Sequence, residues 1–144
     1  MRVEHRWPLL AFALVGGCVG DGTGLDEFGR PVRTPAGPLA PTLSSIQERI
    51  FSPICAAACH TGASAPLGLA LDAGVARANL VGVASVEQPA MLRVRPSQPD
   101  SSYLIWKLEG RAGITGGRMP LGLAPLTAEE LNAIRQWIAA GAPD

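Results

Sequence analysis

The chain has 144 residues, enough for one small domain with its own apolar core. It carries 12 Lys and Arg against 12 Asp and Glu, and this zero formal charge excludes the strongly basic surface typical of nucleic-acid-binding proteins. The 17 Gly and 13 Pro residues predict a large share of loop, and the 5% aromatic content predicts a thin core.

The first 17 residues have the pattern of an export signal. Arg2 and Arg6 come before a short apolar stretch, and two glycines precede Cys18. The apolar stretch is too short to span a bilayer. We therefore predict a signal peptide over residues 1–17.

Cys18 closes a segment, Leu14 to Cys18, that resembles the bacterial lipobox. The resemblance implies that Cys18 is acylated and becomes the mature N-terminus, which anchors the protein to a membrane. Val19 stands where an Asp would favour the inner membrane, so the resemblance implies a periplasm-facing or outer-membrane lipoprotein. The alternative is an ordinary signal peptide that leaves Cys18 as a free thiol.

Residues 18–41 are rich in Gly, Pro, Asp and Thr and lack hydrophobic periodicity, which predicts a flexible linker. The folded domain is expected over residues 42–144. Thr42 or Ser44 is positioned to cap its first helix, which we expect to end before Pro53. Apolar residues recur there at helical spacing: Leu43, Ile46, Ile50 and Phe51.

Between residues 61 and 109 the sequence predicts short elements. In chain order they are a loop over 61–66, an extended segment over 67–71, a helical turn over 76–80, an extended segment over 91–96 and a helix over 103–108. Pro99 to Ser102 supply turn and cap residues for that helix, and Gly110 stops it.

A Gly- and Pro-rich loop over residues 110–126 precedes the last predicted helix. Thr127 and Glu130 form a capping box at its start, and Gly141 follows its end. One face is apolar: Leu131, Ile134, Trp137 and Ile138. The predicted fold class is therefore mostly α, a small helical domain with long Gly/Pro-rich loops.

Cys55 and Cys59 are separated by three alanines and followed at once by His60. The pattern resembles the Cys-x-x-Cys-His signal for covalent haem attachment, in which two thioethers hold the macrocycle and the histidine binds the iron. The gap is one residue longer here. Because positions i and i+4 of a helical turn are as close as i and i+3, both thiols can still face one side. We therefore predict haem c bound through Cys55 and Cys59, with His60 as an axial ligand of the iron.

Other uses of these residues are a zinc site, a disulfide and a redox-active thiol pair. A structural zinc site needs four protein ligands, whereas Cys18 is expected to be acylated and His5 to be removed during maturation, so too few ligands remain. A thiol oxidant of the Cys-x-x-Cys type is expected beside a βαβ pattern, which is absent from the sequence pattern. A Cys55–Cys59 disulfide in a non-haem structural or interaction lipoprotein remains the main alternative.

Met119 is the expected second axial ligand. It lies in a loop between Arg118 and Pro120, a position that suits delivery of a side chain to a metal, and a thioether is a common sixth ligand in electron carriers. Met91 is the competitor, although its apolar neighbours make packing the simpler role.

Together these features resemble the class I c-type cytochromes, and more closely the small cytochrome c-like lipoproteins of bacterial envelopes. The likeness covers about residues 43–143. It is carried by Cys55 to His60, Arg118-Met119-Pro120, Asn79 to Val83, Pro99 to Leu104, Lys107-Leu108, and the last helix with Ile134, Trp137, Ile138 and Gly141-Ala142. The resemblance implies a helical fold in which the first and last helices cross and a haem lies between His60 and Met119.

We expect an electron carrier rather than an enzyme, because His60 is the only histidine of the mature chain and leaves none for acid–base catalysis. The expected partners are a redox protein of unknown identity and, through the lipid anchor, a membrane. Trp106, Leu104 and Leu121 are expected to wall the haem. The candidates for binding its propionates are Arg95, Arg111, Arg118 and Trp106.

Overall fold

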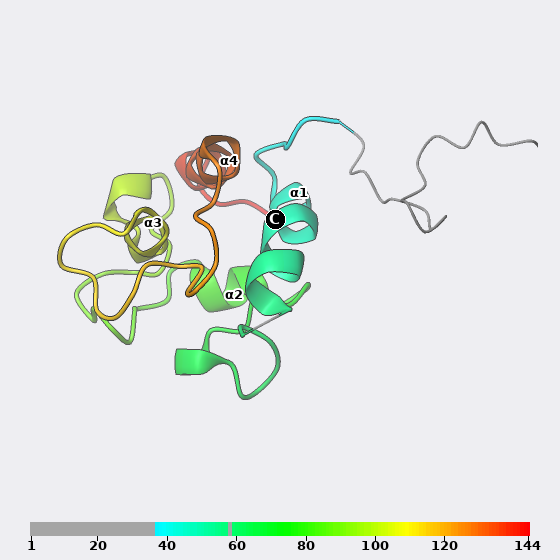
Figure 1. Ribbon diagram of the computed structural model, residues 1–144. Helices are drawn as coiled ribbons and strands as arrows, with labels where there is room; N and C mark the ends of the chain where they lie inside the picture. Colours follow the sequence, from blue (N-terminus) through cyan, green and yellow to red (C-terminus); the bar gives the residue numbers. More distant parts are fainter. Residues whose placement is uncertain (1–36, 58) are drawn as a thin grey trace, which may run out of the picture. The chain divides into compact units, whose positions relative to one another are not determined.

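The computed structural model describes residues 37–57 and 59–144. The predicted signal peptide, the lipidation site Cys18 and most of the predicted linker lie outside these residues. Within them the chain is mostly helical, as predicted, and forms isolated β-bridges but no strand (Figure 1). The α-helices of this part are α1 (Leu43–Ile46), α2 (Ala76–Leu80), α3 (Tyr103–Glu109) and α4 (Ala128–Ala139). None of the helices in the described ranges is both long enough and apolar enough to cross a membrane.

The first helix begins as predicted but does not end as predicted. The Thr42 hydroxyl caps α1 by accepting a hydrogen bond from the Ser45 N–H at 3.3 Å. Beyond α1 the helix continues as a π-helix, η1 (Gln47–Ala56), with Pro53 inside it. The prediction that the helix stops before Pro53 is therefore wrong.

Packing explains why η1 continues past Pro53. Ile50 and Phe51 are fully buried, and burial stabilises each by roughly 1.5–3 kcal/mol, which is enough to offset a proline in a helix. Pro53 itself is exposed, so its ring does not disturb the packing of the core. Ala56, after the proline, is buried again, so the same helix face stays in the core.

The segment over residues 67–71 is not extended, contrary to the prediction. A 3₁₀ turn, η2 (Pro66–Gly68), occupies its start, and Leu67 adopts a left-handed backbone with φ of 57°. No neighbouring strand pairs with this segment within the described residues. Its carbonyl groups instead accept hydrogen bonds from the side chain of Arg93. Alternating leucines predict a strand only where a pairing partner exists.

The helices α2, α3 and α4 are confirmed, but the Ser102 hydroxyl does not cap α3 as predicted, because it donates to the Gln98 carbonyl instead. A second 3₁₀ turn, η3 (Pro99–Ser101), leads into α3, and Gly110 ends α3 in the left-handed conformation with φ of 69°. Both halves of the predicted capping box are formed at α4, since Thr127 Oγ1 accepts from the Glu130 N–H and Glu130 Oε2 accepts from the Thr127 N–H.

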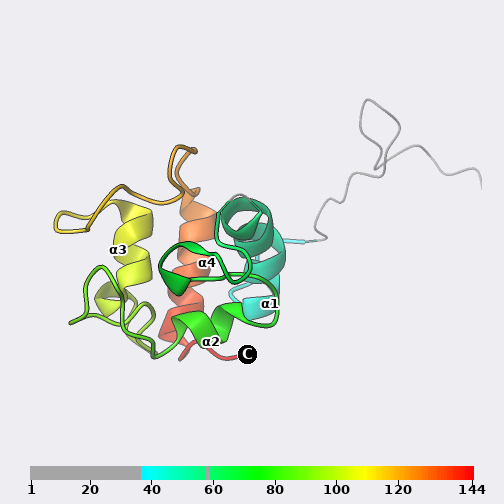
Figure 2. The ribbon, with the colours of Figure 1, turned by 90° about the horizontal axis from the view of Figure 1, so that it is seen from below.

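The helix α4 lies between α1 and α3, and its apolar face forms the centre of the core (Figure 2). The α1–η1 segment contributes Ile46, Ile50 and Phe51, and α4 contributes Ile134, Trp137 and Ile138. The core also takes in Leu39, from the end of the predicted linker, whose N–H donates to Glu129 at 3.3 Å. The first helical segment therefore packs against the last helix.

Candidate cofactor site

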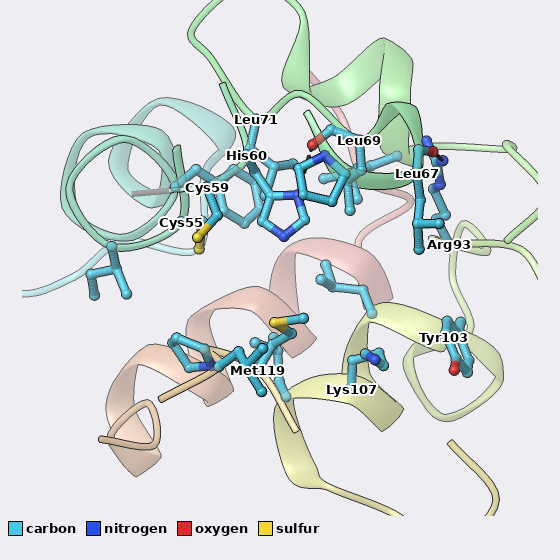
Figure 3. Close-up of a pocket in the computed structure, with 18 of the residues that line it drawn as sticks. Cys55, Cys59, His60, Leu67, Leu69, Leu71, Arg93, Tyr103, Lys107 and Met119 are labelled. Atoms are coloured by element: carbon cyan, nitrogen blue, oxygen red, sulfur yellow. Dashed lines mark hydrogen bonds between the residues drawn. The ribbon is translucent and has the colours of Figure 1, made fainter. Parts of the chain in front are cut away.

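His60 is held so that one ring nitrogen is free. Its Nδ1–H donates to the carbonyl oxygen of Leu69 at 2.9 Å, because a carbonyl oxygen only accepts. With the proton on Nδ1, Nε2 carries the lone pair that binds metals. Figure 3 shows the His60 ring directed into a cavity, toward Met119 on the other side. The imidazole therefore has the tautomer and the orientation of a metal ligand.

The loop after His60 is fixed by further hydrogen bonds. The Leu71 N–H donates to the His60 carbonyl at 2.7 Å. The Asp72 carboxylate accepts from the Thr61 hydroxyl at 2.5 Å and from the Gly62 N–H at 2.8 Å. These hydrogen bonds, that from Thr61 first, lower the pKa of Asp72 below its ordinary value, so the carboxylate is ionised at neutral pH. The backbone of His60 is thus tied to the chain about ten residues further along.

Cys55 and Cys59 lie on one wide turn. The Cys55 carbonyl accepts from the His60 N–H, five residues ahead, at 2.9 Å and from the Cys59 N–H at 3.4 Å. A turn closed by such an i+5 hydrogen bond encloses one residue more than an α-turn and accommodates the three-residue gap. Both cysteines are free thiols and line the same cavity as His60.

The Cys55 thiol has a strongly perturbed pKa. Burial raises this pKa to about 11, and the Glu130 carboxylate adds to the rise because it opposes a second negative charge. The thiol is therefore protonated at neutral pH and is a poor nucleophile and a poor thiolate ligand. This state disfavours a redox-active thiol, whereas an apolar surrounding suits the neutral sulfur of a thioether.

Met119 reaches the cavity from the loop after α3. Its N–H donates to the Lys107 carbonyl at 2.9 Å, and its side chain packs against the hydrophobic core (Figure 3). Met91, the alternative candidate, does not line the cavity. The structure therefore places Met119, and not Met91, opposite His60.

The cavity has a volume of about 380 Å³, within the range typical of small-molecule sites. Its walls are mostly apolar and include Leu104 and Leu121, as predicted. Four large apolar side chains on its lining are more than half exposed: Leu67 (52%), Val86 (58%), Leu121 (66%) and Leu123 (54%). Exposed apolar side chains gathered around a cavity indicate a site for an apolar ligand.

Polar residues that the sequence interpretation missed also line the cavity. Tyr103 and Lys107 of α3 both bind the Glu87 carboxylate, with Tyr103 Oη donating at 3.0 Å and Lys107 Nζ lying 3.0 Å from Oε2. Arg93 lies nearby, and its guanidinium donates to the carbonyl oxygens of Leu67 at 2.6 Å and Asn79 at 2.8 Å. Figure 3 shows Arg93, Tyr103 and Lys107 on the side of the cavity opposite the cysteines.

The residues predicted to bind propionates are not among the lining residues. The Trp106 indole N–H donates to the Asp100 carbonyl at 2.7 Å, and the Arg111 guanidinium stacks on the Trp106 ring at 5.7 Å while pairing with acidic side chains. Arg95 and Arg118 also lie outside the lining. The prediction that Trp106 walls the cavity is therefore wrong, because its polar edge is engaged elsewhere.

The residues at the cavity fit a covalently attached haem. The lining offers an imidazole with a free Nε2, a thioether across from it, two free thiols and apolar walls. Within residues 37–57 and 59–144 there is no cluster of three or more His, Cys, Asp or Glu residues that could hold a metal ion. Comparison of the chain with models of protein families, with curated proteins and with solved structures gave no match.

Proposed function

We propose that this chain is an electron-transfer protein of the bacterial envelope that carries one haem c. Cys55 and Cys59 would hold the haem through thioethers, and His60 and Met119 would be the axial ligands of its iron. The observation that carries the proposal is that Met119, far along the chain from the Cys55–His60 motif, lines the same apolar cavity as Cys55, Cys59 and His60. The haem would supply reversible one-electron oxidation and reduction of its iron.

The ligand geometry favours an electron carrier over an enzyme. His60 and Met119 face each other across the cavity, so both axial positions would be filled by the protein and none would be left for a substrate (Figure 3). The titratable groups Glu87, Tyr103 and Lys107 on the lining are hydrogen-bonded to one another rather than free for acid–base chemistry. A methionine ligand also raises the reduction potential relative to two histidines.

The chain's own residues would fix the haem orientation. The hydrogen bond from His60 Nδ1–H to the Leu69 carbonyl holds the imidazole plane and makes Nε2 a better donor. The apolar walls would pack against the faces of the macrocycle, and the wide turn at Cys55 presents both sulfurs to one side. The proposal also includes the envelope location, which would follow from acylation of Cys18. It further includes a redox partner protein.

The test uses the full chain expressed in bacteria together with cytochrome maturation proteins. We expect the intact mass to exceed that of the polypeptide by one haem, and the purified protein to be coloured. Cys55→Ala and Cys59→Ala should each leave one thioether, and the double variant should lose covalent haem. Colourless protein whose mass shows a Cys55–Cys59 disulfide would contradict the proposal and favour a structural lipoprotein.

The axial ligand is tested by paired methionine variants. The oxidised protein should show the sulfur-to-iron charge-transfer band, and Met119→Ala should lose it, whereas the matched control Met91→Ala should keep it. Carbon monoxide should bind the reduced Met119→Ala variant but not the reduced parent protein. Binding of carbon monoxide to the parent at the same rate would show an open iron position and argue for an enzyme or gas sensor.

A further inference from the structure

The side of the cavity opposite the cysteines holds a cation whose charge is not balanced. Arg93 and Lys107 line the cavity and are 9% and 8% exposed. Lys107 is paired with Glu87 at 3.0 Å. Within the described residues no carboxylate lies within ion-pair distance of Arg93. The net charge of this side of the cavity is therefore positive, and Arg93 is its source.

The contacts of Arg93 fix its position without neutralising it. The Nη1 group donates to the carbonyls of Asn79 at 2.8 Å and Gly68 at 3.4 Å, and Nη2 donates to Leu67 at 2.6 Å. Of the five N–H donors of a guanidinium, these contacts leave the Nε–H and one hydrogen of Nη2. Two donors are the number that a carboxylate accepts in a bidentate pair. Burial also lowers the pKa of Arg93, because the guanidinium has lost part of its hydration.

We propose that Arg93 binds a carboxylate group of the cavity's ligand, which under the proposed function is a propionate of the haem. The inference rests on that function but adds the orientation of the ligand. The carboxylates of a haem lie on the porphyrin edge away from the groups that form thioethers, and Arg93 lies across the cavity from Cys55 and Cys59 (Figure 3). Lys107 is the weaker partner, because Glu87 and the Thr115 carbonyl already occupy its ammonium group.

The pH dependence of the reduction potential tests this pairing. A propionate beside Arg93 has a lowered pKa and stays ionised, so the potential of the haem-loaded parent protein should be flat between about pH 5 and pH 8. In Arg93→Gln the pKa of the propionate rises, and the potential should gain a slope in this range. At pH 7 the potential should also fall, because a cation that disfavours ferric iron has been removed.

Two further variants separate charge from loop anchoring. Arg93→Lys loses the hydrogen bonds to the three carbonyls but keeps the positive charge. Because the charge is what lowers the pKa of the propionate, the reduction potential of Arg93→Lys should stay nearly independent of pH. Arg95→Gln is the matched control, since Arg95 is two residues away, outside the lining, and its buried Nε has no hydrogen-bond partner. It should leave the profile unchanged.

The outcomes distinguish this inference from the proposed function. A coloured protein whose potential changes between about pH 5 and pH 8, with a slope that persists in Glu87→Gln, would overturn the Arg93 pairing alone, as would an Arg93→Lys profile identical to that of Arg93→Gln. The other titratable side chains on the lining are Cys55, Cys59, His60, Glu87, Tyr103 and Lys107, and Glu87→Gln identifies a slope that comes from the carboxylate of the protein. Protein without haem would overturn both proposals.

Discussion

The ion pair between Lys107 and Glu87 stabilises the polar side of the cavity, and separating its members is a direct test of the fold there. Lys107→Met removes the ammonium group but keeps the length of the side chain. Glu87→Gln removes the negative charge but keeps the shape. The two single variants and the double variant form a cycle that isolates the energy of the pair.

The structure sets the expected magnitude. Lys107 Nζ lies 3.0 Å from Glu87 Oε2, and the two side chains are 9% and 19% exposed. Loss of one partner from a fully buried pair costs about 3–5 kcal/mol, because the other charge stays behind in the protein. Glu87 keeps some solvent and the hydrogen bond from Tyr103, so we expect Lys107→Met to lower the free energy of unfolding by about 3 kcal/mol. Glu87→Gln should cost about 2 kcal/mol, since Lys107 still donates to the Thr115 carbonyl.

The double variant should lose at least about 1.5 kcal/mol less than the sum of the two single variants, because neither charge is then left unpaired. Urea unfolding of the haem-free protein, followed by tryptophan fluorescence, measures each value. Asp144→Asn is the control, since the carboxylate side chain is 88% exposed in its pair with Arg77 and should contribute under about 0.5 kcal/mol. Additive losses, or a stability of Lys107→Met within about 0.5 kcal/mol of the parent, would refute the reasoning.

Three further predictions concern the thiols, the loop before Met119 and acid stability. With the Cys55 pKa at about 11, about one Cys55 thiol in a thousand is ionised at pH 8, so iodoacetamide should label the exposed Cys59 of haem-free protein well before Cys55. Equal labelling rates of the two cysteines, measured by mass spectrometry, would contradict this. Gly110→Ala should destabilise the protein more than Gly74→Ala, because both glycines have positive φ but only at Gly110 would the new Cβ lie 3.0 Å from a side chain, that of Arg118 next to Met119. Equal urea midpoints for the two variants would show that the contact with Arg118 does not matter. Hydrogen bonds from Arg111 and Arg135 lower the pKa of Asp100 below its ordinary 3.8, so Asp100→Asn should destabilise the protein fully above about pH 5 and progressively less as the pH falls through the folded-state pKa. A stability difference between parent and Asp100→Asn that persists at pH 2 would argue against this linkage.

Elements with strong local signals could be predicted from the sequence. The capping box at Thr127, the stop at Gly110 and the cap at Thr42 each depend on hydrogen bonds or backbone angles within a few residues. The four haem-binding candidates could be named because their chemistry is visible in the residue types and the spacing. Their placement around one cavity supports the interpretation of the motif.

The remaining features depend on distant contacts. The passage of the helix through Pro53 follows from burial of its apolar face against α4, and the turn at Leu67 is held by a guanidinium 26 residues away. Arg93 has no local pattern that marks it as a ligand-binding residue. In the sequence it resembles Arg95, and only the fold shows that one lines the cavity and the other does not.

The π-type turn at Cys55 ties the length of the motif to the winding of its helix. Deleting Ala57 to restore the usual two-residue gap would remove one of the residues spanned by the hydrogen bond from the His60 N–H to the Cys55 carbonyl, so the direction of His60 relative to Met119 would change. The insertion and the helix type thus compensate each other. Shortening the motif is therefore a geometric change to the proposed haem site, and a designer who edits the spacing has to redesign η1 as well.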